Sequence, residues 1–234
     1  MTLPVGEPVA AKPDADTPGK MDRAGKFITL SPVNPDSDCG MLYECSHGSE
    51  QREQLWTYMG YGPFADADAM RQWLIQCSES TDPLFLTVRD HGSGSPVGMV
   101  GFLNMVPDAR RLEIGHIWYA PDAQRTKTNT EAVYLLLREA FETLEYRRVE
   151  WKCDSHNARS RAAAARLGFQ YEGVFRQHLI VKGRNRDTAW FSMLDREWPA
   201  VKKNMELWLY DNEDGKLSLK DLNAPTSAPG GRVY

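Results

Sequence analysis

A polar loop at residues 120–129, APDAQRTKTN, carries two basic side chains and runs straight into a helical pattern. The first backbone N–H groups of a helix have no partner within the helix, so a helix start favours an anion such as phosphate. Arg125 and Lys127 would repel the positive end of the helix dipole unless an anion lay between them. Thr128 and Glu131, however, have the spacing of a capping box, which explains the same stretch as a well-capped helix. The spacing alone leaves both interpretations open.

A second stretch, residues 156–173, reads HNARSRAAAARLGFQYEG. Asn157 is placed to cap the N-terminus of a helix, and Gly168 to end that helix. Ser160 falls one turn into the helix, where a hydroxyl could hydrogen-bond a reacting group. A lone serine at such a position more often belongs only to the helix surface. Cys153 and His156 are two possible zinc ligands, but they lack a second pair, so no metal site is predicted.

The composition limits the classes of function. The chain has 234 residues, a formal charge of −4 and a pI near 5.8, which argues against a general nucleic-acid-binding protein. No stretch approaches the roughly 20 apolar residues of a membrane span, and the N-terminus lacks the apolar core of a signal peptide. The four cysteines show no paired spacing, which favours reduced thiols. We therefore expect a soluble, cytoplasmic protein without membrane or nucleic-acid partners.

The apolar pattern indicates which elements position these residues. From Thr128 onward, apolar side chains recur three and four residues apart, which is typical of an amphipathic helix. Strands are predicted elsewhere by alternation and by flanking turns. The predicted strands are residues 26–33, 83–90, 97–106, 111–120, 147–154, 169–181 and 187–195, and the predicted helices are residues 49–59, 66–79, 128–144, 157–168 and 197–210.

This order of elements predicts an α/β chain, with meandering strands followed by strand–helix–strand units. It indicates one domain over residues 25–196, built on a central mixed sheet with helices on both faces. Residues 1–24 are rich in proline and have little apolar surface to bury, so we expect them to be disordered. Residues 197–234 are expected to form a C-terminal helix followed by a flexible tail.

Taken together, the two polar stretches and the elements around them resemble the acetyl-CoA-binding core of the GNAT N-acetyltransferases. The resemblance covers about residues 80–195, and its specific part is RRVEWKCDSHNARSRAAAARLGF. It is nearest to the RimJ/RimL type, which acetylates N-terminal amines of ribosomal proteins. The family usually carries Q/R-x-x-G-x-G/A in the loop, whereas this chain has Lys127 and Asn129 at the two small-residue positions. Glycine allows positive φ angles there, so a more regular loop is expected, with Arg125 and Lys127 adding charge.

The resemblance implies a mostly antiparallel GNAT sheet and acetyl-CoA as co-substrate, without a metal. The residues implied in binding it are Ile117, Trp118, Tyr119, Gln124, Arg125, Thr126, Lys127, Thr128, Asn129, Asn157 and Arg159. The backbone N–H groups of Ile117 to Tyr119 are the implied donors to the oxyanion.

For catalysis, the resemblance implies that an amine attacks the thioester directly. Glu113 is the candidate base, with a solvent-facing strand carboxylate as the alternative, and Ser160 is the candidate donor to the departing thiolate. His178, Arg176 and Trp151 are candidate acceptor-binding residues. The acceptor could be a peptide N-terminus, a polyamine or a drug-like amine, and the protein a monomer or a homodimer. The competing hypothesis is a non-catalytic acyl-CoA-binding domain, because the loop glycines are missing.

Overall fold

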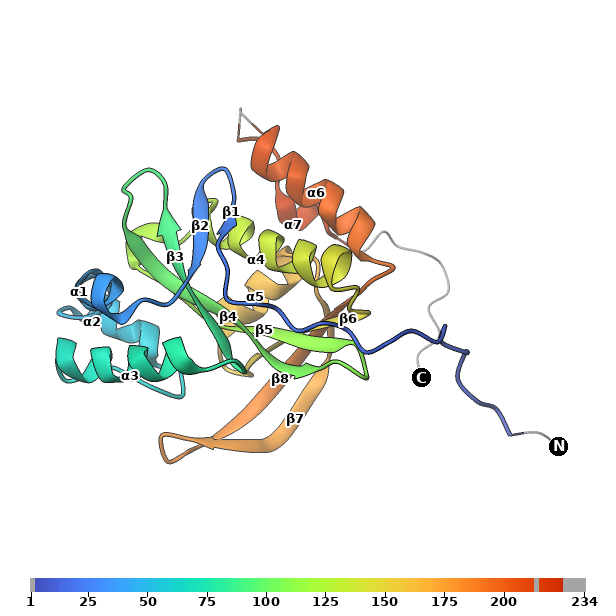
Figure 1. Cartoon of the computed structure of the whole chain (residues 1–234), viewed down its shortest axis with the longest axis horizontal. Coiled ribbons are helices and arrows are strands. Elements are labelled where there is room, and N and C mark those ends of the chain that lie inside the picture. The colour runs from blue at the N-terminus through green and yellow to red at the C-terminus, as the bar shows by residue number, and fades with distance from the viewer. Residues whose placement is uncertain (1–2, 213–214, 225–234) are drawn as a thin grey trace.

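The computed structural model describes residues 3–212 and 215–224 (Figure 1). Its centre is an eight-stranded sheet in the order β1-β2-β3-β4-β5-β6-β8-β7. Every neighbouring pair is antiparallel except β5 with β6, which are parallel. The predicted mixed, mostly antiparallel sheet is therefore confirmed. The strands are Arg23–Ala24 (β1), Ile28–Pro32 (β2), Leu84–Asp90 (β3), Pro96–Val106 (β4), Arg111–Tyr119 (β5), Arg148–Asp154 (β6), Gln170–Val181 (β7) and Arg184–Leu194 (β8).

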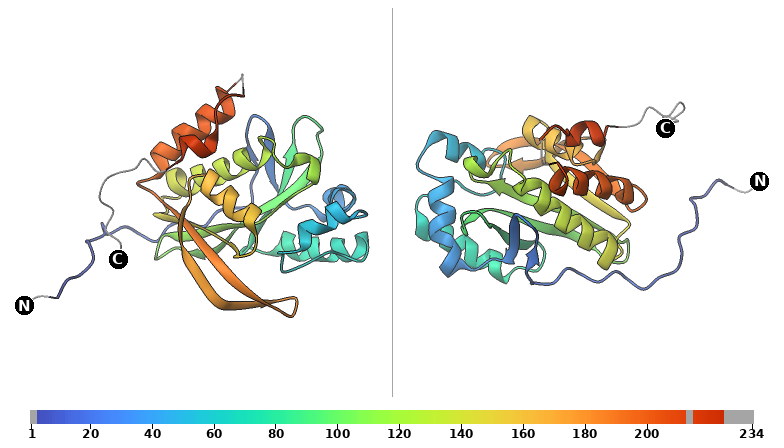
Figure 2. Two further views of the ribbon diagram at one scale, coloured as in Figure 1. Left: turned by 180° about the vertical axis from the view of Figure 1, so that it is seen from behind. Right: turned by 90° about the horizontal axis from the view of Figure 1, so that it is seen from above.

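Helices cover both faces of this sheet, as predicted (Figure 2). The main core lies between the sheet and three elements: α4 (Thr128–Arg138), the end of α5 (Ala158–Arg166) and α6 (Trp198–Tyr210). A second core lies on the opposite face, against α1 (Pro35–Ser46) and α3 (Ala67–Glu79). The shorter elements are α2 (Glu50–Glu53), η1 (Gln54–Trp56), η2 (Pro121–Ala123), the π-helical turn η3 (Glu139–Thr143) and α7 (Leu219–Leu222). None of the described helices is long and apolar enough to cross a membrane.

The predicted ends of α5 are confirmed. The Asn157 side chain accepts a hydrogen bond from the Ser160 amide at 3.0 Å, and Gly168 takes a φ of +93° just beyond the helix. Such a φ suits glycine, and the Phe169 amide then reaches back to the Ala164 carbonyl at 3.0 Å. These local signals fix α5 beside the end of β6, which places Ser160 next to the sheet.

The capping box predicted at the start of α4 is wrong. The residue before the helix is Lys127, which makes no side-chain cap, and the Thr128 amide donates to the Thr126 hydroxyl at 3.2 Å. Glu131 instead points away from the helix end. Its buried carboxylate accepts hydrogen bonds from the backbone amides of residues 26, 27 and 28 and from the Tyr210 hydroxyl. The carboxylate thus fastens the turn between β1 and β2, and the end of α6, to α4.

Further elements differ from the prediction. The helix predicted over residues 49–59 is reduced to the short α2 and the 3-10 turn η1. Helix α1 was not predicted, because Pro35, Gly40 and several polar residues interrupt its apolar pattern. Asn34 caps this helix, and the fully buried Asp38 accepts from the Thr87 hydroxyl at 2.6 Å, so tertiary contacts secure it. In addition, Arg184 and Arg186 belong to β8 rather than to a turn, because the chain reverses at Lys182 and Gly183.

The N-terminal segment has two different parts. Its first described residues extend away from the sheet (Figure 1), and Leu3, Val5 and Val9 are exposed. Further along, Lys12 pairs with Glu145 at 2.7 Å, and Ala15 is buried in the main core. At the C-terminal end, the tail beyond residue 224 lies outside the described residues.

Candidate active site

Strands β5 and β6 lie side by side over only three residues each and then separate. Their ladder pairs Arg111–Glu113 with Arg148–Glu150, although β5 continues to Tyr119 and β6 to Asp154. At His116 the backbone takes a φ of +53°, close to a register shift between β4 and β5. A ligand can therefore hydrogen-bond the facing edges of β5 and β6 beyond Glu113, since these edges do not pair with each other.

The loop after β5 leads from this separation to α4. Gln124 donates from its side-chain amide to the Tyr119 carbonyl at 3.0 Å, which ties the loop to the strand. Arg125 has a φ of +63°, so the turn occurs at an arginine, and not at Lys127 or Asn129, the two positions at which the resemblance implies small residues. The described residues supply no acceptor to the backbone amides of residues 125–127, 129 and 130. These amides at a helix N-terminus form a suitable site for an anion.

The structure corrects the expectation that Lys127 adds charge to this loop. The Lys127 ammonium donates to the Leu209 carbonyl at the end of α6 and lies 4.7 Å from the centre of the Phe27 ring. It stabilises the negative end of the α6 dipole instead. Arg125 remains exposed in the loop, so of the two cations only Arg125 is placed to face a bound anion.

Ser160 lies on the same face of the sheet as α4. Its hydroxyl oxygen accepts a hydrogen bond from the Trp151 indole at 3.0 Å. A hydroxyl both donates and accepts, so Ser160 can also donate its proton, and the Cys153 sulfur is one acceptor within reach. Trp151 is buried in the main core, so the structure does not place it on the face that carries His178. The neighbouring Cys153 is also buried, which raises the pKa of its thiol and makes it a poor nucleophile.

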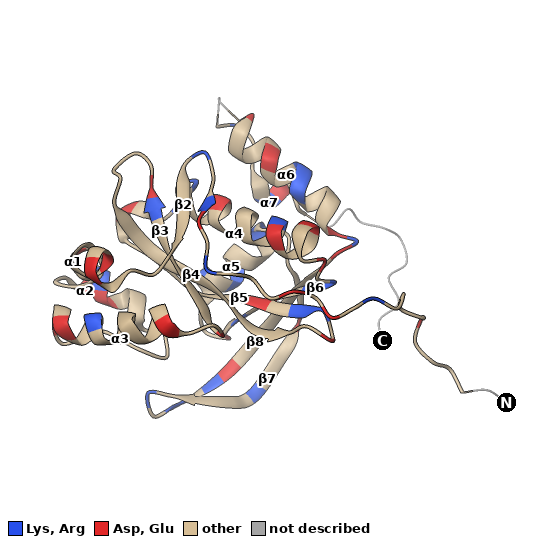
Figure 3. Ribbon diagram, viewed as in Figure 1, with Lys and Arg blue, Asp and Glu red and all other residues tan. Residues whose placement is uncertain are grey.

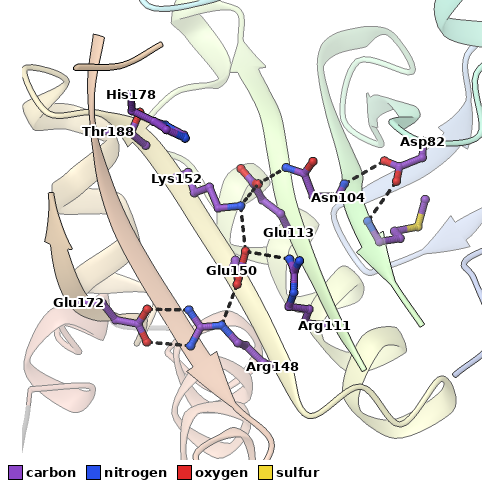
Figure 4. A network of polar contacts seen from close by, with 11 residues as sticks. Asp82, Asn104, Arg111, Glu113, Arg148, Glu150, Lys152, Glu172, His178 and Thr188 are labelled. Carbon is purple, nitrogen blue, oxygen red and sulfur yellow. Dashed lines mark hydrogen bonds and ion pairs between the residues drawn. The ribbon is translucent and has the colours of Figure 1, made fainter. Parts of the chain in front are cut away.

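Glu113 lies on the opposite face, at the last pair before β5 and β6 separate. It is not solvent-facing, because only 5% of the residue is exposed. The Lys152 ammonium lies 2.8 Å from Glu113 Oε2, and the Asn104 side-chain amide donates to the same oxygen at 2.7 Å (Figure 4). Burial raises the pKa of Glu113, and the Lys152 charge opposes that rise. Sequence reasoning missed Lys152 and Asn104, although the alternation of Glu150 and Lys152 places both on one face of β6.

Aromatic side chains lie on the sheet face that carries Glu113, next to the part of β5 that no longer pairs with β6. The His116 ring lies 4.5 Å from Phe85 and 5.7 Å from Tyr61 between centroids. Burial lowers the pKa of His116 to about 4, so the imidazole is neutral at pH 7. Trp118 is buried nearby, and its indole N–H has no hydrogen-bond partner among the described residues. Sequence analysis did not select Tyr61, because it lies in a loop whose pattern signals only a break.

The β7–β8 hairpin borders this face. His178 and Arg176 lie on its exposed strand, and the His178 imidazole contacts the Thr188 hydroxyl at 3.0 Å. At the tip, the Lys182 ammonium donates to the Trp56 carbonyl at 2.8 Å, so the hairpin reaches across to the α1–α3 layer. Charged positions of both signs lie on β5–β8 (Figure 3).

Comparison with known proteins identifies this arrangement. An acetyltransferase (GNAT) domain model matches residues 28–170, more than half of the chain. The chain belongs to the GNAT acetyltransferase family. Members of the family use acetyl-CoA, and the resemblance seen in the sequence is thereby confirmed.

Named relatives agree with this assignment. This acetyltransferase is 31% identical over 182 residues to the Bacillus subtilis protein named "Putative ribosomal N-acetyltransferase YdaF", covering 77% of this chain and 98% of the relative. A GCN5-related N-acetyltransferase from Brucella melitensis has a TM-score of 0.86 at 39% identity, covering 90% of this chain and 97% of that one. A probable GNAT-family acetyltransferase from Chromobacterium violaceum has a TM-score of 0.77 at 40% identity, covering 86% and 99%.

The residues of this acetyltransferase fit the family's co-substrate. The amides of the loop suit the phosphates, and the Asn129 side-chain oxygen and the Tyr119 hydroxyl are buried without a partner in the described chain. Other buried atoms of the described chain also lack a partner, but these two belong to the loop and to the strand end before it, where a bound ligand would supply one. Arg159 is exposed at the start of α5.

Proposed function

We propose that this acetyltransferase transfers acetyl from acetyl-CoA to a primary amine by direct attack in the separation between β5 and β6. One observation carries the proposal: the two candidate catalytic side chains, Ser160 and Glu113, lie on opposite faces of the sheet, and both border this separation. The thioester can therefore enter from the face of α4 and α5, and the amine from the face of Glu113.

Each side chain has a separate task in this reaction. The amine nitrogen forms a bond to the carbonyl carbon, and the carbon–sulfur bond breaks. Glu113 takes the proton that the amine loses, and the Ser160 hydroxyl donates a hydrogen bond to the departing thiolate. Successive amides of β5 alternate between its two edges, and those of Trp118 and Ala120 face β4. The amides of Ile117 and Tyr119 are therefore the proposed donors to the developing oxyanion. No side chain needs to become acylated.

We infer that the preferred amine is the N-terminus of a protein. The name of the Bacillus subtilis relative supports a ribosomal acceptor. The exposed β7–β8 hairpin and its contact with Trp56 provide a surface on which a polypeptide could lie. His178 and Arg176 would contact the acceptor there. Polyamines and drug-like amines would lack such extended contacts.

The test is transfer of labelled acetyl from acetyl-CoA to a panel of amines. The panel contains ribosomal-protein N-terminal peptides, the same peptides with a blocked N-terminus, spermidine and an aminoglycoside. We expect label only on peptides with a free N-terminus. If the label appears on the small amines instead, the inference about the acceptor is wrong, but the proposed reaction still holds. Binding of acetyl-CoA by calorimetry without transfer to any amine would show a non-catalytic binding domain.

Ser160→Ala tests the role of the serine in the same assay. Loss of one hydrogen bond to the leaving thiolate should lower kcat about 10²–10³-fold while leaving acetyl-CoA affinity nearly unchanged. Ser155→Ala, in the turn just before α5, is the matched control. A parent-like kcat in Ser160→Ala would mean that this serine does not assist the thiolate.

A further inference from the structure

Lys152 lies between two buried carboxylates on the open face of the sheet. Its ammonium is 2.8 Å from Glu113 Oε2 and 2.8 Å from Glu150 Oε2 (Figure 4). The side chain is only 10% exposed, and its ammonium lies 4.1 Å from the centre of the Trp190 ring. One cation thus serves two anions in a site from which water is largely excluded, where electrostatic interactions are strong.

The two oxygens of Glu113 have different surroundings. Oε2 receives the Asn104 amide at 2.7 Å and the Lys152 ammonium. No described residue donates a hydrogen bond to Oε1. Oε1 lies 3.6 Å from the point that a Cβ atom on Gly115 would occupy. Because Glu113 belongs to the last β5–β6 pair, Oε1 lies at the point where the two strands separate.

The other partners of this network surround Glu150. Arg148 donates to Glu150 Oε1 at 2.8 Å, and Arg111 lies 3.8 Å from Oε2. On β7, Glu172 accepts two hydrogen bonds from the Arg148 guanidinium, at 2.7 and 2.6 Å. On the other side of Glu113, Asp82 accepts from the Asn104 backbone amide at 2.9 Å, which fixes the strand that carries the Asn104 side chain.

We propose that Lys152 is a positioning residue for the acetyl transfer. Together with Asn104 it holds Oε2 of Glu113, so that Oε1 is presented to the incoming amine. Glu150 competes for the same ammonium and sets how strongly Lys152 keeps Glu113 ionised. This inference rests on the proposed function, in which Glu113 is the base.

The geometry makes opposite predictions for the two partners of Glu113. Without the ammonium, burial and the nearby Glu150 favour the protonated form, so the pKa of Glu113 rises. Without the Glu150 charge, the ammonium is shared with no second anion, so the pKa of Glu113 falls. Because only the ionised carboxylate accepts a proton, activity is lost as the pH falls through this pKa. In a plot of kcat/KM against pH, the acid limb is the range in which activity falls as the pH is lowered. Lys152→Met should move this limb to higher pH, and Glu150→Gln should move it to lower pH.

The experiment is the pH dependence of kcat/KM for the full chain, with acetyl-CoA and a peptide bearing a free N-terminus. The peptide amine titrates identically in every assay, so the ratio of variant to parent rate at each pH isolates the enzyme group. We expect the acid limb to move up by about one pH unit or more in Lys152→Met and down by a smaller amount in Glu150→Gln. The matched control is Lys202→Met on α6, which removes the ion pair between Lys202 Nζ and Glu142 Oε1 at 2.8 Å. It should leave the acid limb in place.

Unshifted limbs, or shifts of the two variants in the same direction, would overturn the inference. If Lys152→Met does not fold, Lys152→Gln takes its place, because Glu150→Gln alone also removes the direct repulsion between the two carboxylates and so cannot isolate the ammonium. Glu113→Gln separates this inference from the proposed function. If that variant keeps the acid limb, Glu113 is not the base, whatever the other variants do. If it loses the limb while Lys152→Met and Glu150→Gln leave it in place, only the role of Lys152 fails.

Discussion

Glu131 on α4 and Glu113 on β5 are both buried carboxylates, but their oxygens are used differently. Glu131 is fully buried, and both of its oxygens accept two hydrogen bonds: Oε1 from the Lys26 amide at 2.8 Å and the Tyr210 hydroxyl at 2.9 Å, and Oε2 from the amides of Phe27 and Ile28 at 2.7 and 2.9 Å. Glu113 has both of its close contacts on one oxygen.

The difference separates a carboxylate that joins segments from one that can react. All the donors that bind the Glu131 carboxylate belong to the protein: three are backbone amides of the β1–β2 turn region, and one is a hydroxyl at the end of α6. The side chain therefore connects these two segments to α4. Glu113 keeps one oxygen without a donor among the described residues beside the separated strands, and a buried carboxylate in that condition is suited to accept a proton. Burial alone therefore does not mark a catalytic residue, and the number of occupied oxygens is more informative.

The largest effect is expected from Glu131→Ala. The change leaves three backbone amides and a tyrosine hydroxyl without their acceptor in the core. Buried donors without partners cost about 1–3 kcal/mol each, so the free energy of unfolding should fall by at least about 3 kcal/mol. Urea denaturation measures this, with the exposed Glu53→Ala as control, expected within about 0.5 kcal/mol of the parent. A loss below about 1 kcal/mol would contradict the structural role of Glu131.

Gly115→Ala tests the free oxygen of Glu113. The added methyl would lie 3.6 Å from Oε1 and would push against the flexible end of Leu103 at 2.9 Å. It narrows the space in which the amine must approach, so kcat/KM for the amine should fall about tenfold, since small displacements of reacting groups are costly. The dissociation constant of acetyl-CoA should stay unchanged. Parent-like kinetics would show that the amine does not approach at Oε1.

Separate changes of the two loop cations have smaller expected effects. Lys127→Ala removes the contact with the Leu209 carbonyl, so stability should fall by about 1 kcal/mol with little change in acetyl-CoA affinity. Arg125→Ala should show the reverse: parent stability, weaker binding and a reduced dependence of affinity on salt. Calorimetry at two salt concentrations, together with thermal unfolding, distinguishes them. A loss of affinity in Lys127→Ala, with Arg125→Ala unaffected, would reverse the assignment.

The smallest effect is expected from removing residues 1–11. This part ends before the Lys12–Glu145 ion pair and the buried Ala15, and Leu3, Val5 and Val9 within it are exposed. Unfolding free energy and acetyl-CoA affinity should both stay within experimental error of the full chain. A clear loss of either would show that the exposed segment contacts the domain.

Local sequence signals predicted the elements that depend on local physics. Alternating apolar residues gave β3 to β6, and Asn157 with Gly168 gave both ends of α5, because the partners of each signal lie within a few residues. The function of Glu131 could not be predicted, since its acceptor geometry depends on amides more than 100 positions away in the chain. The same holds for Lys127, whose partner is the Leu209 carbonyl, and for Lys152, which becomes notable only when β5 lies beside β6.

The most direct test compares Glu113→Gln with Glu131→Gln in two measurements, acetyl transfer and stability. Glu113→Gln and Glu131→Gln would each be examined for the single-turnover rate of acetyl transfer at pH 7 and for the free energy of unfolding. We predict that Glu113→Gln slows transfer about 10²–10⁴-fold and changes the free energy of unfolding by less than about 1 kcal/mol. Glu131→Gln should lose about 1–3 kcal/mol of stability, while its folded fraction transfers acetyl near the parent rate. A Glu113→Gln protein that transfers acetyl at the parent rate would contradict the assignment of Glu113 as the base.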